Sequence, residues 1–195
     1  MKRKHDKKGM VMIGVGMVLL LGVLFLVSCG EALEENYLEP AKLSKDAEGL
    51  VSIMGLPKEW IFQYRVADET RITLRADYYE GGKQTISYAP AFSGNIEGEG
   101  LLVLDYEDGE FFLGVADDGG HQSIQTTLGD PESMGSLKHS FEERITLESG
   151  TYPLAAVVMS RDGSIQSQGI ADQEAIDFSI KNNDYMVVFT LEVHP

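Results

Sequence analysis

The sequence feature that most restricts the fold is a two-residue alternation of apolar and polar side chains, which begins after Glu59. The alternating apolar positions are Trp60, Phe62, Tyr64 and Val66, then Ile72, Leu74, Ala76 and Tyr78, and near the C-terminus Val187, Phe189, Leu191 and Val193. A period of two is typical of β-strands that bury one face. Continuous apolar runs over 101–104 and 154–159 indicate central strands that are covered on both faces.

Three glycine-containing dipeptides predict tight turns between such strands. They are Gly81-Gly82, Asp108-Gly109 and Asp162-Gly163. Glycine reaches the positive φ values that short hairpin turns require. The third dipeptide is expected to join the apolar run before it to a further strand over 165–170. The segment 145–154 is typical of a strand, a turn and a strand. Together these signals predict an antiparallel meander.

One short helix is expected before the strands. Ser44 is a plausible N-cap, and Gly55 and Pro57 end the segment. Its predicted apolar face carries Ala47, Leu50, Val51 and Met54. With no other helix expected, we predict an all-β domain over 46–195, an antiparallel β-sandwich of the immunoglobulin-like or jelly-roll-like kind. A β-barrel is the alternative.

The N-terminus has the character of a secretory leader. Residues 1–8 contain five basic side chains, and residues 10–28 carry no charge and are mostly apolar. A basic head followed by an apolar body directs a chain into the cytoplasmic membrane. The run is also about long enough to cross a bilayer as a helix. An uncleaved signal anchor is therefore the alternative to a cleaved leader, and both place the following domain outside the cytoplasm.

The leader ends in Leu26-Val27-Ser28-Cys29, which contains the sole cysteine of the chain. This tetrapeptide resembles the lipobox of bacterial lipoprotein precursors. The resemblance implies that Cys29 receives a diacylglyceryl group and that cleavage between Ser28 and Cys29 removes a signal peptide of residues 1–28. Residues 29–45 would then be the lipidated N-terminus and an acidic tether. The predicted location is the outer, extracytoplasmic face of the cell membrane, because two acyl chains anchor a protein firmly.

The charge of the predicted mature chain restricts its partners. Residues 29–195 keep 30 acidic and 11 basic residues, which is a formal net charge of −19. Phosphate backbones need basic partners, so nucleic acid is not expected to bind. With Cys29 used for lipid, no disulfide within the chain is expected. The fold must therefore be held by its core.

Acidic side chains dominate the middle of the chain, where no Lys or Arg lies between Lys83 and Lys138. The candidate metal ligands there are Asp105, Glu107, Asp108, Glu110, Asp117 and Asp118. Clustered carboxylates on loops are the ligands that Ca²⁺ prefers, although their spacing does not match an EF-hand. The acids are otherwise interpreted as a solvated edge that discourages strand pairing, or as a docking face for a basic partner. No other cofactor is expected.

Catalytic signatures are missing from the sequence. It contains no His-Glu-x-x-His motif and no Gly-x-Ser-x-Gly motif, and its cysteine is assigned to the lipid anchor. We therefore predict no enzyme activity and no catalytic residue, but a binding or interaction module at the cell envelope with a protein partner there. The alternatives are a Ca²⁺-dependent surface module and an envelope hydrolase with an unrecognised carboxylate pair.

Overall fold

The structure is a computed structural model that describes residues 36–45, 60–107, 109–117, 120–127 and 135–195, without the side chains of 88–91. The expected helix beyond Ser44 therefore lies almost entirely outside the described residues, as do the predicted leader and Cys29. Within the described ranges, no helix combines the length and apolar character that a membrane span requires.

The described fold is mostly antiparallel β-structure in one nine-stranded sheet. Its strands are β1 (Tyr37–Pro40), β2 (Trp60–Glu80), β3 (Lys83–Glu107), β4 (Glu110–Asp117), β5 (Gly120–Thr127), β6 (Gly135–Ser140), β7 (Ile145–Thr146), β8 (Gly150–Ser160) and β9 (Tyr185–Val193). The order across the sheet is β5-β4-β3-β2-β9-β8-β6, and β1 pairs with β2 and β7. The prediction of antiparallel β-structure is confirmed.

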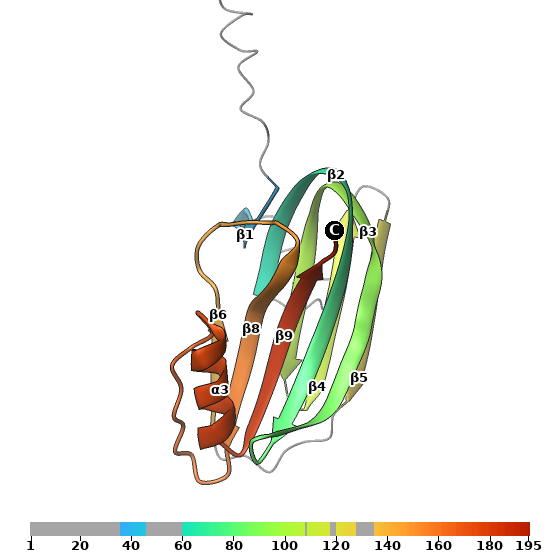
Figure 1. Ribbon diagram of the computed structural model, residues 1–195. Coiled ribbons are helices and arrows are strands. Elements are labelled where there is room, and N and C mark those ends of the chain that lie inside the picture. The colour runs from blue at the N-terminus through green and yellow to red at the C-terminus, as the bar shows by residue number, and fades with distance from the viewer. Residues whose placement is uncertain (1–35, 46–59, 108, 118–119, 128–134) are drawn as a thin grey trace, which may run out of the picture. The chain divides into compact units, whose positions relative to one another are not determined.

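A long hairpin of β2 and β3 gives the sheet its curl. Its turn is Gly81-Gly82, where both residues have positive φ values, of 55° and 81°. The pairing of β2 with β3 shifts register between Val66 and Thr70. On the other side of β2, residues 62–65 pair with β1, whereas residues 72–80 pair with β9. The two halves of β2 thus have different neighbours, and the sheet is curled into a half-barrel (Figure 1).

The concave face of the sheet holds the main hydrophobic core. The alternating positions predicted from the sequence are buried there, except that Tyr78 is partly buried and packs against the others. Further members come from β3, β4 and β8, including Leu102, Leu104, Phe111 and Leu113. Trp60 and Phe111 both meet Phe189 in edge-on ring contacts, with ring centroids 5.7 and 6.5 Å apart. The period-two pattern thus identified the buried face correctly.

The convex face carries a second, smaller core beneath a helix that the sequence analysis did not expect. The helix is α3 (Gln173–Asn182), and Figure 1 shows it against the outer face of β8 and β9. Ile176 and Ile180 of α3 pack on Ala156, Val158 and Met186. The continuous apolar run of β8 is therefore covered on both faces, as predicted. The expectation of no helix beyond the first was wrong.

The Asp162-Gly163 dipeptide makes a turn but does not join two strands. Gly163 has the expected positive φ of 79°, and Asp162 accepts hydrogen bonds from Ser160 and from the Ser164 amide. The chain beyond it is irregular, and the Gln166 amide donates to the side chain of Asn183 instead of to a strand. The strand predicted over 165–170 was wrong. At the predicted turn after β3, Gly109 has a positive φ of 80° and Glu107 pairs with Glu110, so the predicted β3–β4 hairpin is confirmed, although Asp108 lies outside the described residues.

Candidate functional site

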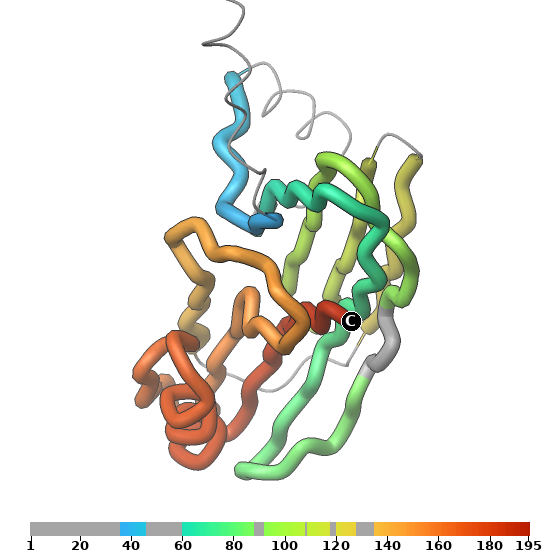
Figure 2. Tube along the Cα trace, turned by 45° about the horizontal axis from the view of Figure 1, so that its top comes forward, coloured from blue at the N-terminus to red at the C-terminus, as the bar shows by residue number. Residues whose placement is uncertain are grey.

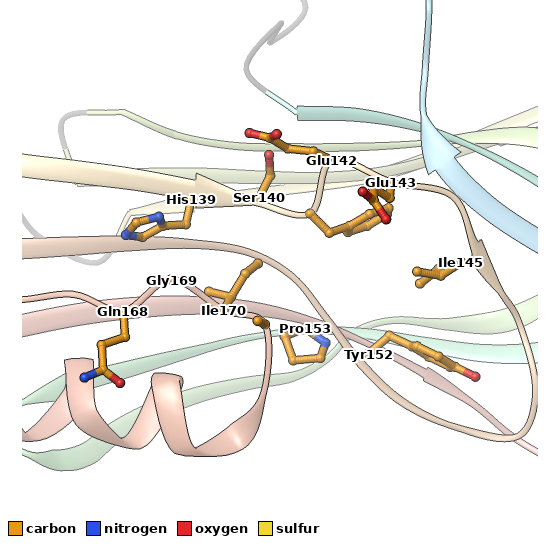
Figure 3. A pocket seen from close by; sticks show the side chains of 12 residues that line it. His139, Ser140, Glu142, Glu143, Ile145, Tyr152, Pro153, Gln168, Gly169 and Ile170 are labelled. Carbon is orange, nitrogen blue, oxygen red and sulfur yellow. The ribbon is translucent and has the colours of Figure 1, made fainter.

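A cleft of about 420 Å³ opens where β6 and β8 separate (Figure 3). We call it the β6–β8 cleft. It is lined by His139, Ser140, Phe141, Glu142, Glu143, Ile145, Tyr152, Pro153, Gln168, Gly169, Ile170 and Ala171. The lining comes from the end of β6, the segment after it, the start of β8 and the segment before α3. Its volume is in the range of small-molecule binding sites.

Pro153 stands close to the point where the two strands separate. The last paired residues of β6 and β8 are Ser140 and Ala155. Two positions before Ala155 stands Pro153, which has no N–H to donate to a ladder. The pairing of β8 with β9 also shifts register between Pro153 and Ala155. The Phe141 amide makes one last hydrogen bond to the Leu154 carbonyl, 3.3 Å away, before the chain turns off.

Two aromatic side chains of the cleft are held in place by other parts of the fold. The ring of Phe141 stacks on core residue Phe62, with centroids 4.6 Å apart and planes 14° apart. The Tyr152 hydroxyl accepts from the Glu148 amide at 2.8 Å and donates to the Glu148 carbonyl at 3.0 Å. Because these rings are already ordered, a ligand would meet a preformed apolar wall, which lowers the entropy cost of binding.

A chain of hydrogen bonds runs from His139 into α3. The His139 Nε2 lies 2.8 Å from the Ser167 hydroxyl, which in turn lies 3.1 Å from the Ser179 hydroxyl. Ser179 donates its proton to the Ala175 carbonyl, 2.9 Å away. Its oxygen is left to accept, so Ser167 donates to Ser179 and accepts from His139 Nε2–H. The Gly169 amide also donates to Ser167, at 3.2 Å.

The donors and acceptors in this chain of hydrogen bonds determine which ring nitrogen of His139 carries the proton. Neutral imidazole has one donor nitrogen, so Nε2–H leaves Nδ1 of His139 as a hydrogen-bond acceptor. Burial lowers the pKa of His139 below its ordinary value, which favours the neutral ring near neutral pH. The Ser167 proton is directed to Ser179 and away from the imidazole.

The charge of the lining is negative. Glu142 and Glu143 lie on the segment after β6, across the cleft from Gln168 and Ile170 (Figure 3). No Lys or Arg is among the described residues that line the cleft. The guanidinium of nearby Arg144 instead lies over the ring of Tyr37, 3.6 Å from its centroid. An apolar wall beside two carboxylates is suited to a ligand with an apolar body and a positive charge.

The structure separates the predicted acidic ligands into two places. Glu107 and Glu110 face each other at the tip of the β3–β4 hairpin. Asp105 lies on β3, two residues before that strand ends at Glu107. Asp117 ends β4, seven residues beyond Glu110. An odd separation in a strand puts side chains on opposite faces, about 23 Å apart along the strand. Asp108 and Asp118 lie outside the described residues.

Asp117 lines a second pocket, of about 330 Å³, with Asn95, His121 and Gln122 among its neighbours. This pocket is smaller and more polar than the β6–β8 cleft. Among the described residues, no three His, Cys, Asp or Glu side chains gather closely enough to hold a metal ion. A cation site at either end of the β3–β4 hairpin stays a prediction.

Comparison of the chain with protein-family models, with curated proteins and with solved structures gives no match. The candidate site therefore depends on its own geometry. Sequence reasoning missed the β6–β8 cleft because its lining is spread over residues 139–171 without a common motif. The one signal that could have indicated it is Pro153, placed at the start of an otherwise continuous apolar strand.

Proposed function

We propose that this chain is a lipid-anchored, extracytoplasmic lipoprotein whose β-domain binds a ligand in the β6–β8 cleft without catalysis. The ligand class is a molecule, or an exposed side chain of an envelope protein, with an apolar body and a positive charge. The observation that carries the proposal is the lining itself, in which ordered rings stand beside Glu142 and Glu143 and no Lys or Arg is among the described lining residues.

The proton order in the hydrogen-bond chain supports a binding role over hydrolysis. A serine nucleophile needs its hydroxyl proton aimed at the base that removes it. In the described network the Ser167 proton goes to Ser179, whose own proton goes to Ala175. His139 therefore presents a hydrogen-bond acceptor, Nδ1, and this acceptor suits an ammonium or guanidinium donor on the ligand.

The envelope location is supported by the leader and by the sequence around Cys29. Its test is metabolic labelling of a bacterial culture with a radioactive fatty acid. The wild-type chain is expected to take up label and to lose residues 1–28. The Cys29→Ala variant is expected to take up none. Equal labelling of the two chains would refute the lipid anchor.

Ligand binding is tested on the lipidated chain in a neutral detergent. The probe is phenethylamine, and phenylacetate is the matched probe of opposite charge. Calorimetry is expected to show binding of the amine alone. Changing both Glu142 and Glu143 to Gln is expected to weaken it by about tenfold, since each exposed charge contact is worth up to about 1 kcal/mol.

The matched control is Glu148→Gln, because the Glu148 side chain is exposed and does not line the cleft. This variant is expected to bind the amine within about twofold of the wild type. The proposal is overturned if the amine does not bind, if phenylacetate binds equally well, or if the double variant and the control behave alike.

For the closure of the fold we propose a partly open β-barrel in preference to a two-sheet sandwich. All described strands belong to one hydrogen-bonded sheet, and one core cluster fills its concave face. A sandwich has two separate sheets packed face to face. In the proposed barrel, β5 and β6 lie at the two borders of the opening.

A further inference from the structure

β5 is a terminal strand of the sheet and forms one of its borders (Figure 2). Its eight residues pair with β4 in an uninterrupted antiparallel register, from Gly120 opposite Asp117 to Thr127 opposite Glu110. Within the described residues, no strand pairs with its other side. A terminal strand has a row of backbone N–H and C=O groups that can pair with a further strand.

The sequence of β5 lacks the features with which proteins usually prevent such pairing. Natural edge strands carry lysine, proline, bulges or inward charges. The strand reads Gly-His-Gln-Ser-Ile-Gln-Thr-Thr, with no proline and no Lys, Arg, Asp or Glu. Its register with β4 shows no bulge. The opposite border strand differs, because β6 carries Lys138 at its centre.

The surroundings of β5 are acidic. Glu110 and Asp117 lie opposite its two ends on β4, and Gln125 donates to the Glu110 carboxylate at 3.1 Å. No Lys or Arg occurs anywhere between Lys83 and Lys138, a stretch that includes the whole of β4 and β5. A strand that adds to this border would therefore lie in a negative field. Its most favourable occupant is positively charged.

We infer that β5 is a docking edge for an extended, basic segment of a protein partner, which adds to the sheet as a further strand. Backbone pairing with β5 supplies the affinity, and the attraction of Lys or Arg side chains to the acidic surroundings of β5 supplies the selectivity. A second copy of this chain is a poorer occupant, because each predicted mature chain has a formal net charge of −19. The inference does not depend on the β6–β8 cleft.

The test uses the full lipidated chain in a neutral detergent. The probe is a capped peptide of about eight residues in which lysine alternates with valine. Hydrogen exchange read by mass spectrometry is expected to show that the peptide slows exchange in residues 120–127. Fluorescence anisotropy gives its affinity, which we expect to fall about tenfold between about 50 and about 300 mM NaCl, because salt screens exposed charges.

The same serine-to-lysine substitution on each border strand shows which of the two strands binds the peptide. Ser123 on β5 and Ser136 on β6 are both exposed. Ser123→Lys adds a repelling charge to the proposed docking edge and is expected to weaken peptide binding at least about fivefold. Ser136→Lys is the matched control and is expected to stay within about twofold of the wild type.

Two control peptides test the mode of binding. One has proline at a central valine position, which keeps the charge but prevents strand pairing, and the other has glutamate in place of lysine. Neither is expected to slow exchange in β5. The inference is overturned if the proline peptide binds as well as the lysine–valine peptide, or if that peptide slows exchange only in residues other than 120–127. It is also overturned if self-association of the chain already protects β5 from exchange before any peptide is added.

Discussion

Asp77 shows how a single residue organises the convex face of the sheet. It lies on β2 with its side chain away from the main core, and it is 4% exposed. Its carboxylate accepts hydrogen bonds from Arg75 at 2.7 Å, from Gln84 at 2.8 Å and from Ser87 at 2.6 Å. Arg75 also pairs with Glu192 on β9. One carboxylate thus connects side chains of β2 and β3 directly, and through Arg75 it is connected to β9.

We expect Asp77→Ala to lower the free energy of unfolding by about 3 kcal/mol. The substitution removes three hydrogen bonds to a buried carboxylate, and each such bond contributes about 1 kcal/mol. Urea unfolding followed by circular dichroism measures the change. The control is Asp68→Ala at an exposed site on the same strand, where we expect at most about 0.5 kcal/mol. Equal losses in both variants would contradict this assignment.

Tyr64 gives a prediction that depends on pH. Its side chain is fully buried in the main core, and its hydroxyl has no hydrogen-bond partner among the described atoms. Burial first, and the Asp117 carboxylate second, raise the pKa of Tyr64 to about 12. The unfolded chain ionises this tyrosine near pH 10, so the folded state holds the proton more tightly. Its contribution to stability is therefore complete below pH 10 and is lost as the pH rises.

We expect Tyr64→Phe to reduce the loss of stability between about pH 10 and 12 by up to about 1.4 kcal/mol per pH unit. At pH 7 the variant should be at least as stable as the wild type, because it removes an unsatisfied buried hydroxyl. Urea unfolding at several pH values measures both effects. Parallel alkaline slopes for the two chains would show that this tyrosine does not ionise on unfolding as described.

Among the elements, α3 depends on a local cap as well as on its apolar face. Asp172 is in extended conformation, and its side chain accepts from the Ala175 amide at 2.8 Å. Such an N-cap satisfies one of the amides that have no partner within the helix. The helix in turn covers the outer face of β8 and β9 through Ile176 and Ile180.

Asp172→Ala is expected to lower the free energy of unfolding by about 1 kcal/mol. Gln173→Ala, one residue further on, removes only an exposed side-chain bond to Asp177 and should cost a few tenths of a kcal/mol. Both are measured by urea unfolding. If the two variants lose equal stability, the cap does not contribute as the geometry indicates.

At the scale of the elements, the sequence predicted the strands better than it predicted the helix α3. Strand alternation identified the buried faces of β2 and β9, because a half-buried strand has a simple period. The helix α3 was missed, since its ten residues bury only Ala175, Ile176, Ser179 and Ile180. A helix this short forms mainly by packing on a surface that the sequence does not display. The same applies to 165–170, where side-chain bonds to Asn183 replace a strand ladder.

For the whole molecule, the net charge leads to a prediction about salt. Residues 29–195 have a formal net charge of −19. Repulsion between these like charges lowers the stability of the folded state. Raising NaCl from about 20 to about 300 mM should therefore raise the melting temperature of the protein by several degrees, because the Debye length falls below about 10 Å. Thermal unfolding followed by circular dichroism measures this rise.

CaCl₂ at matched ionic strength is the control, and we expect it to raise the melting temperature by no more than NaCl does. A larger, chelator-reversible rise that Asp105→Asn or Asp117→Asn abolishes would instead indicate the cation site predicted from the acidic stretch. The two variants distinguish the hairpin tip from the far end of β4.

The sequence by itself determined the properties that depend on neighbouring residues. These are the strand periodicity, the glycine turns at 81–82 and 108–109, the uncharged apolar stretch that ends at Cys29, and the sign of the charge between Lys83 and Lys138. Each is local, because it depends on side chains within a few positions of one another. Because the sequence shows only which residues are neighbours along the chain, it could name the candidate acidic ligands but could not show which of them lie close together in space.

Only the tertiary structure decided which distant segments meet. It joined β6, β8 and the segment before α3 around one cleft, and it connected His139 to Ser179 through Ser167. It also left β5 at a border of the sheet. These arrangements depend on strand order and on the end of the β6–β8 ladder at Ala155, and many strand orders are compatible with one alternating pattern. For that reason the faces of this protein could be predicted from its sequence, whereas its candidate sites could not.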